Sequence, residues 1–279
     1  MGPRTTRHKK GNDTMRISTL LFLAVVLAMF GSGSGVTYAK PKSQPAYIAI
    51  GGLTAFGENQ GDETYVDLFR GFLESKVGLK EPVELKDLTF DGIHPFIVPG
   101  LAWAAATEIQ NRNFDADKRN DVKVVTLDLA VEDWMIATVP GMLDCFEYGP
   151  VENCIDDRDE FVDILEHAAR EAAGLIRGAD PNVYLLMRTG YVGVDLDDAP
   201  AAEAAEFLLE GNAETGTDAG LNDAVRAIAN EYGAGLADVY GLILPSDVNP
   251  DAWPFLLPSG DAKIAGALAD ALLAGGKIK

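Results

Sequence analysis

Two adjacent acids, Glu132 and Asp133, are the residues whose types and spacing point most directly to chemistry. They follow an apolar, β-branched run at 122–129 that predicts a buried strand. In open α/β sheets, ligands bind at the carboxyl ends of the strands. Together with Asp128 and Asp251, the two acids could bind a cation or act as an acid and base on a sugar. The alternative is a group of solvated loop acids on an acidic protein.

A few hydroxyl, imidazole and indole groups are further candidates. Thr54 follows a glycine-rich turn and is expected to support that turn, and His94 lies in a loop that could border a site. Trp134 directly follows the two acids and could line a groove for a sugar or an acyl chain, as could Trp103 and Trp253. Packing in the core is the alternative for all three. No Cys or His cluster suggests a metal site, and we expect no cofactor.

Strand and helix signals alternate along the chain, which predicts a three-layer α/β/α sandwich with a mainly parallel sheet. A segment rich in Asp, Ala and Glu at 194–217 resembles an inserted surface helix and loop. The expected strands are 47–50, 122–129, 183–187 and 237–240, and the expected helices are 64–77, 99–109, 159–176, 218–232 and 261–273.

The first 39 residues have the pattern of a signal peptide. A basic segment precedes an apolar run at 19–30, and Thr37-Tyr38-Ala39 is a suitable cleavage site. The apolar run is shorter than the ~20 residues that span a bilayer. We therefore expect a secreted or periplasmic protein with no membrane span after cleavage, and a single domain over 40–279. An uncleaved N-terminal anchor is the alternative.

The charge and the cysteines narrow the choice of partners and compartment. The net charge is −20, and the first 39 residues hold five of the basic side chains but only one acid, so the remainder is more acidic still. This charge argues against binding to nucleic acid or to an anionic membrane, because phosphate contacts need Lys and Arg. The two cysteines, Cys145 and Cys154, are expected to form a disulfide in an oxidising compartment.

Four short blocks, in this order, resemble those of the SGNH/GDSL hydrolases. The segment 47–57, Tyr-Ile-Ala-Ile-Gly-Gly-Leu-Thr-Ala-Phe-Gly, is similar to the family's first block, a strand that runs into Gly-Asp-Ser-Leu-Thr. Gly92 falls where the family has a glycine whose N–H helps to bind the oxyanion. The other two blocks are 124–133, similar to a strand ending in Gly-x-Asn-Asp, and 257–265, similar to the segment after Asp-x-x-His-Pro. The resemblance covers nearly the whole of 46–273 and implies the same three-layer fold.

The blocks depart from the family at the positions that do its chemistry. Gly52 stands in place of the nucleophilic serine, and Glu132 in place of the asparagine that donates to the oxyanion. Leu257 or Trp253 takes the place of the histidine base, depending on the alignment. Asp251 could match the aspartate of the triad but has no histidine to orient. The resemblance therefore implies a fold without its usual set of catalytic residues.

Three functions remain in competition. The first is a non-catalytic binding protein that keeps the cleft and takes a carbohydrate or acyl ligand, or a protein partner. Its expected binding residues are Thr54, Glu132, Asp133, Trp134 and Asp251. The second is an active esterase or acylhydrolase of the GDSL family that uses a non-standard site. The third is an exported α/β protein of another family.

Overall fold

A computed structural model of the chain describes residues 44–58, 62–76, 82–90, 95–114, 121–136, 138, 151–192, 199–211 and 219–276. Ser43–Lys279 forms one compact unit. The expected signal peptide lies outside the described residues, so its assignment stays a prediction. Within the described part of the chain, no helix is both long and apolar enough to cross a membrane.

The centre of the unit is a five-stranded sheet in the order β2-β1-β3-β4-β5, in which every neighbouring pair is parallel. Parallel pairing places the carboxyl ends of all five strands at one edge of the sheet, where the residues of a site can gather. The strands are β1 (Ala46–Gly51), β2 (Glu84–Thr89), β3 (Val122–Leu127), β4 (Tyr184–Arg188) and β5 (Gly235–Ala237).

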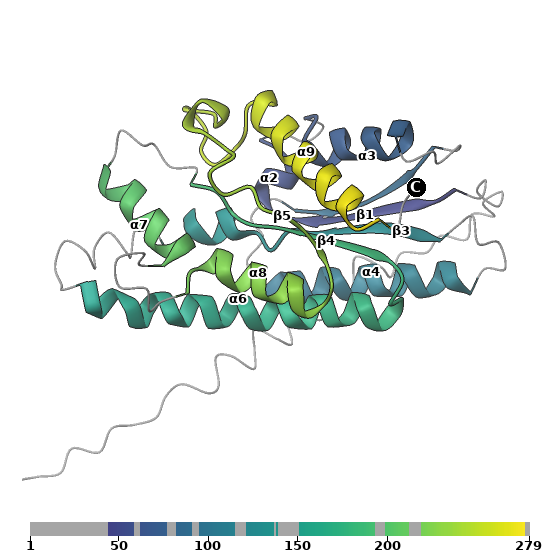
Figure 1. The fold of residues 1–279 in the computed structure, drawn as a ribbon, viewed down its shortest axis with the longest axis horizontal. Coiled ribbons are helices and arrows are strands. Elements are labelled where there is room, and N and C mark those ends of the chain that lie inside the picture. The colour runs from purple at the N-terminus through teal and green to yellow at the C-terminus, as the bar shows by residue number, and fades with distance from the viewer. Residues whose placement is uncertain are drawn as a thin grey trace, which may run out of the picture. The chain divides into compact units, whose positions relative to one another are not determined.

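Helices cover both faces of the sheet. The alternation along β1 shows why: Tyr47 and Ala49 belong to one buried cluster, whereas Ile48 and Ile50 belong to the other. Figure 1 shows helices on both faces of the sheet. The first layer is α3 (Tyr65–Lys76) and α9 (Pro258–Ala274), and the second is α4 (Val98–Asn113), α6 (Val151–Ala179) and α8 (Leu221–Glu231).

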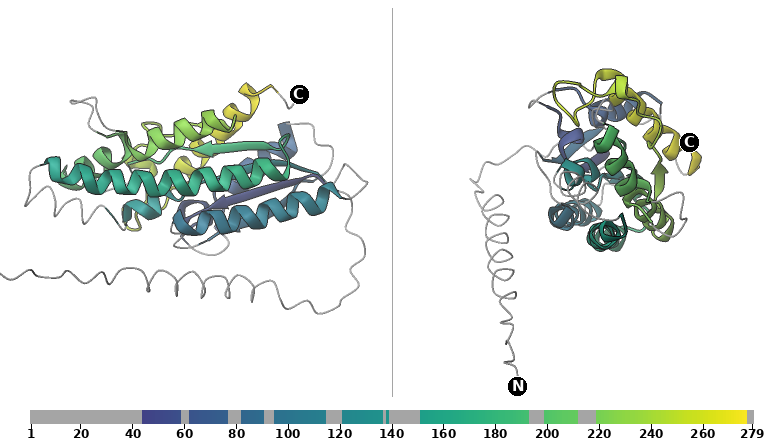
Figure 2. Two further views of the ribbon diagram at one scale, coloured as in Figure 1. Left: turned by 90° about the horizontal axis from the view of Figure 1, so that it is seen from below. Right: turned by 90° about the vertical axis from the view of Figure 1, so that its left-hand side faces the viewer.

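The long helix α6 organises the second layer. It runs beside α4 along the sheet (Figure 2). Its Arg158 is fully buried, with the guanidinium carbon 4.7 Å from the ring centre of Phe207 in α7 (Ala199–Glu210). Leu208 and Leu209 of α7 are also fully buried. The expected surface helix therefore contributes to the core.

The three-layer architecture expected from the sequence is confirmed, and two strands differ in detail. The edge strand β2 was not expected, because its sequence Glu-Leu-Lys-Asp-Leu-Thr is largely polar and half-buried. The last strand was expected at 237–240 but lies at Gly235–Ala237. The N–H groups of Val239 and Tyr240 donate to Thr189 Oγ1, at 2.9 and 3.2 Å. They therefore do not form the backbone hydrogen bonds of a sheet.

Candidate functional site

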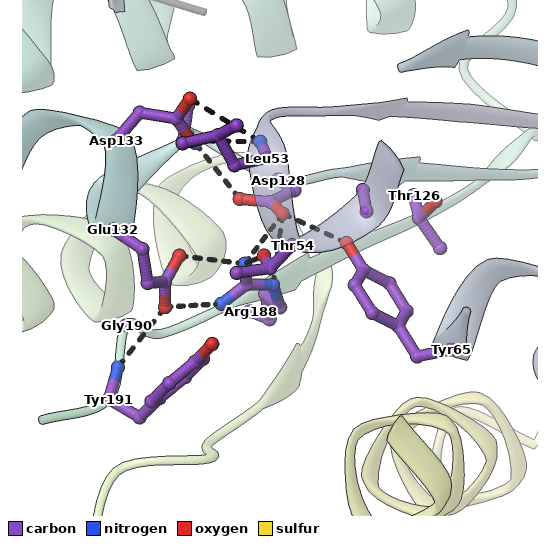
Figure 3. Close-up of polar contacts among 12 residues, drawn as sticks. Leu53, Thr54, Tyr65, Thr126, Asp128, Glu132, Asp133, Arg188, Gly190 and Tyr191 are labelled. Atoms are coloured by element: carbon purple, nitrogen blue, oxygen red, sulfur yellow. Dashed lines mark hydrogen bonds and ion pairs between the residues drawn. The ribbon is translucent and has the colours of Figure 1, made fainter. Parts of the chain in front are cut away.

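Residues from four segments meet at the carboxyl edge of the sheet. Thr54 comes from α2 (Leu53–Phe56), the single turn that follows β1. Asp128 comes directly after β3, Glu132 lies in the helical turn at 131–136, and Arg188 is the last residue of β4. Figure 3 shows these side chains converging on the guanidinium. All four are at least 97 % buried.

Arg188 is the centre of this group. Its Nε and Nη2 donate to Asp128 Oδ2 at 3.1 and 2.6 Å. Its Nη1 and Nη2 donate to the two carboxylate oxygens of Glu132, both at 2.8 Å, and Nη2 also donates to Thr54 Oγ1 at 2.7 Å. A planar guanidinium suits such two-point contacts, which are among the strongest hydrogen bonds in proteins. We refer to Arg188, Asp128, Glu132 and Thr54 as the arginine cluster.

A second set of groups donates to the same two carboxylates, and the Ala130 N–H donates at 2.9 Å to Asp128 Oδ1, the oxygen that Arg188 leaves open. The hydroxyl of Tyr65 donates to Asp128 Oδ2 at 2.8 Å, and the backbone N–H of Tyr191 donates to Glu132 Oε1 at 3.2 Å. The two tyrosine rings also lie 5.6 and 6.0 Å from the guanidinium carbon, within the range of cation–π contacts. A buried network of this kind is stable only when its members are paired, and here each charged group is.

The electrostatics keep Arg188 charged and Tyr65 protonated. Burial lowers the pKa of Arg188, but Asp128 and Glu132 beside it raise the pKa more, to well above its ordinary value. Burial and the charge of Asp128 raise the pKa of the Tyr65 hydroxyl, so Tyr65 remains a donor. The charged guanidinium therefore faces the carboxyl groups of both Asp128 and Glu132.

Asp133 occupies the space in front of Gly52. Its carboxylate accepts the backbone N–H of Leu53, at 3.0 Å to Oδ2 and 3.3 Å to Oδ1 (Figure 3). A Cβ atom placed on Gly52 would overlap Asp133 Oδ2 and would lie 2.8 Å from the Cβ of Ala130. The backbone of Gly52, with φ −94° and ψ −152°, is one that any residue can adopt. Crowding by Asp133 and Ala130, and not backbone strain, therefore disfavours a side chain at this position.

The carboxyl of Asp133 also has an unusual pKa. Burial, followed by the charges of Asp128 and Glu132, raises the pKa of its carboxyl from 3.8 to about 8, although the Leu53 N–H opposes the rise. The group is therefore mostly neutral at pH 7. A neutral carboxyl can lie next to two carboxylates at little electrostatic cost.

The arginine cluster lies where the sequence allowed either a cation site or a group of solvated loop acids. The cation that Asp128 and Glu132 face is the guanidinium of Arg188, a residue of the chain itself. Among the described residues, no group of three or more His, Cys, Asp or Glu side chains is placed to hold a metal ion. The two carboxylates are also too fully paired to act as an acid and base on a sugar.

A pocket of about 450 Å³ opens beside the cluster. Thr54 contributes to its wall, and the remainder comes from the segment after α2, the start of α3 and the start of α9. Its volume is in the range of small-molecule sites. The ionisable residues that line it are all acids: Glu58, Asp62, Glu63 and Asp261.

Other residues expected at the site lie elsewhere. Trp134 is 5 % exposed and packs edge-on against Phe96 and Phe161, at 6.5 and 5.4 Å between ring centres. It is part of the core. Asp251 is exposed, and its described hydrogen bond is a local one from its N–H to Asn249. It therefore does not join Asp128, Glu132 and Asp133.

Leu257 precedes α9 as its N-cap and is 36 % exposed. Gly92, His94 and Cys145 lie outside the described residues. The expected disulfide between Cys145 and the buried Cys154 therefore remains a prediction.

Three residues of the site were not predicted from the sequence: Arg188, Tyr65 and Asp261. Arg188 follows the expected strand 183–187 directly, and a charged residue at the end of a buried strand is a usable signal for a site. Tyr65 and Asp261 have no comparable signal. Their role depends on contacts such as the Tyr65 N–H to Asp261 Oδ1 bond, at 2.9 Å, between residues 196 apart in the chain.

No protein-family model matches the sequence, and no curated protein sequence matches it significantly. Solved structures do match. The lipase Lip_vut3 from a goat rumen metagenome aligns with a TM-score of 0.62 at 12 % identity, over 85 % of this chain and 100 % of its own. An extracellular lipase from Streptomyces rimosus aligns at 0.54 with 14 % identity, over 81 % of this chain and 99 % of its own.

A carbohydrate esterase of family 3 from Talaromyces cellulolyticus aligns at 0.50 with 14 % identity, over 83 % of this chain and 97 % of its own. These are likenesses of fold at very low sequence identity. They cover nearly the whole of each compared structure, so the shared architecture is that of a complete domain.

Proposed function

We propose that this chain, which has the SGNH/GDSL hydrolase-like fold, is an exported binding protein that does not hydrolyse esters through a serine. The observation that carries the proposal is the contact of Asp133 with the turn after β1. There the carboxyl fills the space in front of Gly52 and occupies the Leu53 N–H. A substrate carbonyl would have to displace this side chain to reach the turn.

The requirements of ester hydrolysis support the same conclusion. The reaction needs a nucleophile, a base to activate it, and donors for the oxyanion. Glycine at 52 supplies no nucleophile. Glu132, where the related enzymes have an asparagine, is an acceptor and is bound on both oxygens by Arg188. Leu257 supplies no base.

The acidic pocket beside Thr54 is the binding site that we favour. Carboxylate oxygens accept hydrogen bonds from ligand hydroxyls, whereas an acyl chain requires a predominantly apolar wall. The wall also contains apolar side chains, among them Leu68, Phe255 and Leu256. A lining of both kinds suits a ligand with hydroxyl groups and an apolar face, such as a carbohydrate. Export is proposed from the signal-peptide pattern of residues 1–39.

One sequence feature favours a second candidate, an active esterase with a relocated base. Asp91-Gly92-Ile93-His94-Pro95 has the Asp-x-x-His-Pro spacing of the family, but it follows β2 and not β5. The preceding residue, Phe90, donates its N–H to Gly51 O at 3.0 Å. Gly51 directly precedes Gly52, in the turn after β1. In this alternative the nucleophile would be Thr54, whose hydroxyl oxygen lies 2.7 Å from Arg188 Nη2.

Labelling with a fluorophosphonate probe, followed by intact-mass measurement, separates the two candidates. The binding-protein proposal predicts no adduct on the folded protein. A stoichiometric adduct on any residue would overturn it, and an adduct on Thr54 that is lost in His94→Ala would establish the relocated site. Far-UV circular dichroism of the same sample verifies that the protein is folded.

A further inference from the structure

Two side chains in the wall of the acidic pocket can make hydrogen bonds beyond those described for them. Asp261 is 93 % buried and accepts the Tyr65 N–H through Oδ1 alone. Thr54 is 97 % buried and accepts from Arg188, while its own hydroxyl hydrogen has no acceptor among the described residues. Buried polar groups are normally paired, so such groups in a pocket wall are suited to bind a polar ligand.

The two open groups have opposite requirements. The free oxygen of Asp261 needs a donor, and the free hydroxyl hydrogen of Thr54 needs an acceptor. A single hydroxyl could meet both needs, and so could a donor and an acceptor on one small molecule. The ligand must therefore carry at least one oxygen as well as a donor group.

The charge of the pocket indicates which kind of donor group the ligand should carry. Its entrance carries three exposed acids, Glu58, Asp62 and Glu63, and no Lys, Arg or His is among the residues that line it. An anionic ligand would be repelled, and a cationic one attracted. A metal ion is a poor occupant, because no group of His, Cys, Asp or Glu in the described part of the chain is arranged to coordinate one.

From these observations we infer that the pocket between α2, α3 and α9 binds a small organic cation that carries both a protonated primary amine and a hydroxyl. In this arrangement the ammonium donates to Asp261 within the field of the three entrance acids, and the hydroxyl oxygen accepts from Thr54. Amino sugars and small amino alcohols share this chemistry. The inference deepens the proposed function, on which it depends.

Calorimetric titration of the purified protein at pH 7 tests the inference. The probes are glucosamine and ethanolamine, which carry both groups, against putrescine (no hydroxyl), N-acetylglucosamine and glucose (no charge) and calcium chloride. We expect one of the first two to bind most tightly. Glucosamine alone would indicate an amino-sugar site, and binding of both would indicate a site for the amino alcohol itself.

Substitutions test whether the ligand binds in this pocket. Asp261→Asn keeps an acceptor for the Tyr65 N–H but removes the charge, and should lower the affinity about tenfold or more. Glu63→Gln should lower it severalfold through the loss of one entrance charge. Glu203→Gln removes the same charge from an exposed position on α7 and should leave the affinity unchanged.

Different results overturn different conclusions. Tighter binding of putrescine, N-acetylglucosamine, glucose or calcium than of both glucosamine and ethanolamine would overturn this inference and leave a binding protein. An equal loss of affinity in Glu203→Gln would do the same. The absence of binding by any probe would likewise overturn it. Fluorophosphonate labelling tests the proposed function separately, because that reaction does not depend on what the acidic pocket holds.

Discussion

Arg188 and Glu132 form a two-point pair in which both nitrogen–oxygen distances are 2.8 Å, with 2 % and 0 % of the side chains exposed. The pair joins the end of β4 to the helical turn after β3, at the edge of the sheet where ligands of open α/β folds bind. Its geometry leaves neither partner free for a substrate. The chain therefore uses this location for a structural ion network, and the pocket open to ligands lies to one side of it.

The first prediction concerns the stability of this network. Arg188→Met replaces the guanidinium with an apolar side chain of similar length and leaves Asp128 and Glu132 buried without a cation. Removing one partner of a buried ion pair costs about 3–5 kcal/mol. We expect a loss of that size in the free energy of unfolding, measured in urea.

The matched control is Arg170→Met in α6. Arg170 pairs with Glu166 and Glu231 at 2.6 and 3.1 Å, but all three side chains are substantially exposed. Exposed pairs contribute about 0–1 kcal/mol. If the two substitutions had equal effects, the arginine cluster could not be the structural element described above.

The second prediction concerns Gly52 and Asp133. Gly52→Ala adds a Cβ that overlaps the Asp133 carboxylate, and overpacking of this kind costs about 1–3 kcal/mol. The double variant Gly52→Ala/Asp133→Gly removes the carboxylate and leaves the close contact with the Ala130 Cβ. In a double-mutant cycle of urea unfolding, the second substitution should therefore suppress part of the cost of the first.

Additive effects in that cycle would show that Asp133 does not occupy the space in front of Gly52. The same crowding predicts that Gly52→Ser alone creates no esterase activity, which a p-nitrophenyl acetate assay can measure against wild-type protein.

The layers of the fold could be predicted from the sequence, but the contacts between distant segments could not. Tyr47 to Ile50 is an apolar run bounded by glycine, and its burial on both faces follows from a parallel sheet. The charged edge strand β2 lacked that pattern. The placement of β5 depended on Thr189, which is 50 residues from Val239 and binds its N–H.

The residues of the candidate site could likewise be predicted only in part. The acids Asp128, Glu132 and Asp133 could be recognised because they follow a strand closely in the sequence. Their partner Arg188 comes from another strand, 60 residues after Asp128. Its pairing with the acids could be predicted only with the knowledge that β3 and β4 are neighbours in the sheet.

The third prediction concerns pH and stability. The pKa of Asp133 is about 8 in the folded protein and has an ordinary value near 3.8 when unfolded. A carboxyl with a raised folded pKa stabilises the fold below its unfolded pKa, and this stabilisation is lost as the pH rises toward 8. The unfolding free energy of the wild type should therefore fall relative to that of Asp133→Asn between pH 5 and pH 8, by up to about 1.4 kcal/mol per pH unit.

Asp133→Asn is the appropriate comparison because asparagine keeps an acceptor for the Leu53 N–H and cannot ionise. Asp261, whose pKa is also raised, to about 7, titrates in both proteins and cancels in the difference. Parallel pH profiles for the two proteins would contradict the burial of an ionisable carboxyl at 133.

The last prediction concerns the pH dependence of amine binding. Burial raises the pKa of Asp261 to about 7, although the Tyr65 N–H and the charge of Arg188 oppose the rise, and the charges of Asp62 and Glu63 add to it. An ammonium ligand binds the carboxylate form, so its affinity should increase as the pH rises through 7. Ethanolamine is the suitable probe, since an alkylammonium remains protonated throughout this range.

Between pH 5.5 and pH 7.5, we expect the affinity of the wild-type protein for ethanolamine to rise about tenfold or more, as measured by calorimetry. In Asp261→Asn the affinity should be low and nearly independent of pH, because the titrating group is gone while the entrance acids, which ionise at lower pH, remain. A pH dependence that survived in Asp261→Asn would place the ammonium on another acid of the pocket, and Glu63→Gln would then be the variant to examine. The pH profile thus identifies which carboxylate holds the cation, which the affinity alone does not.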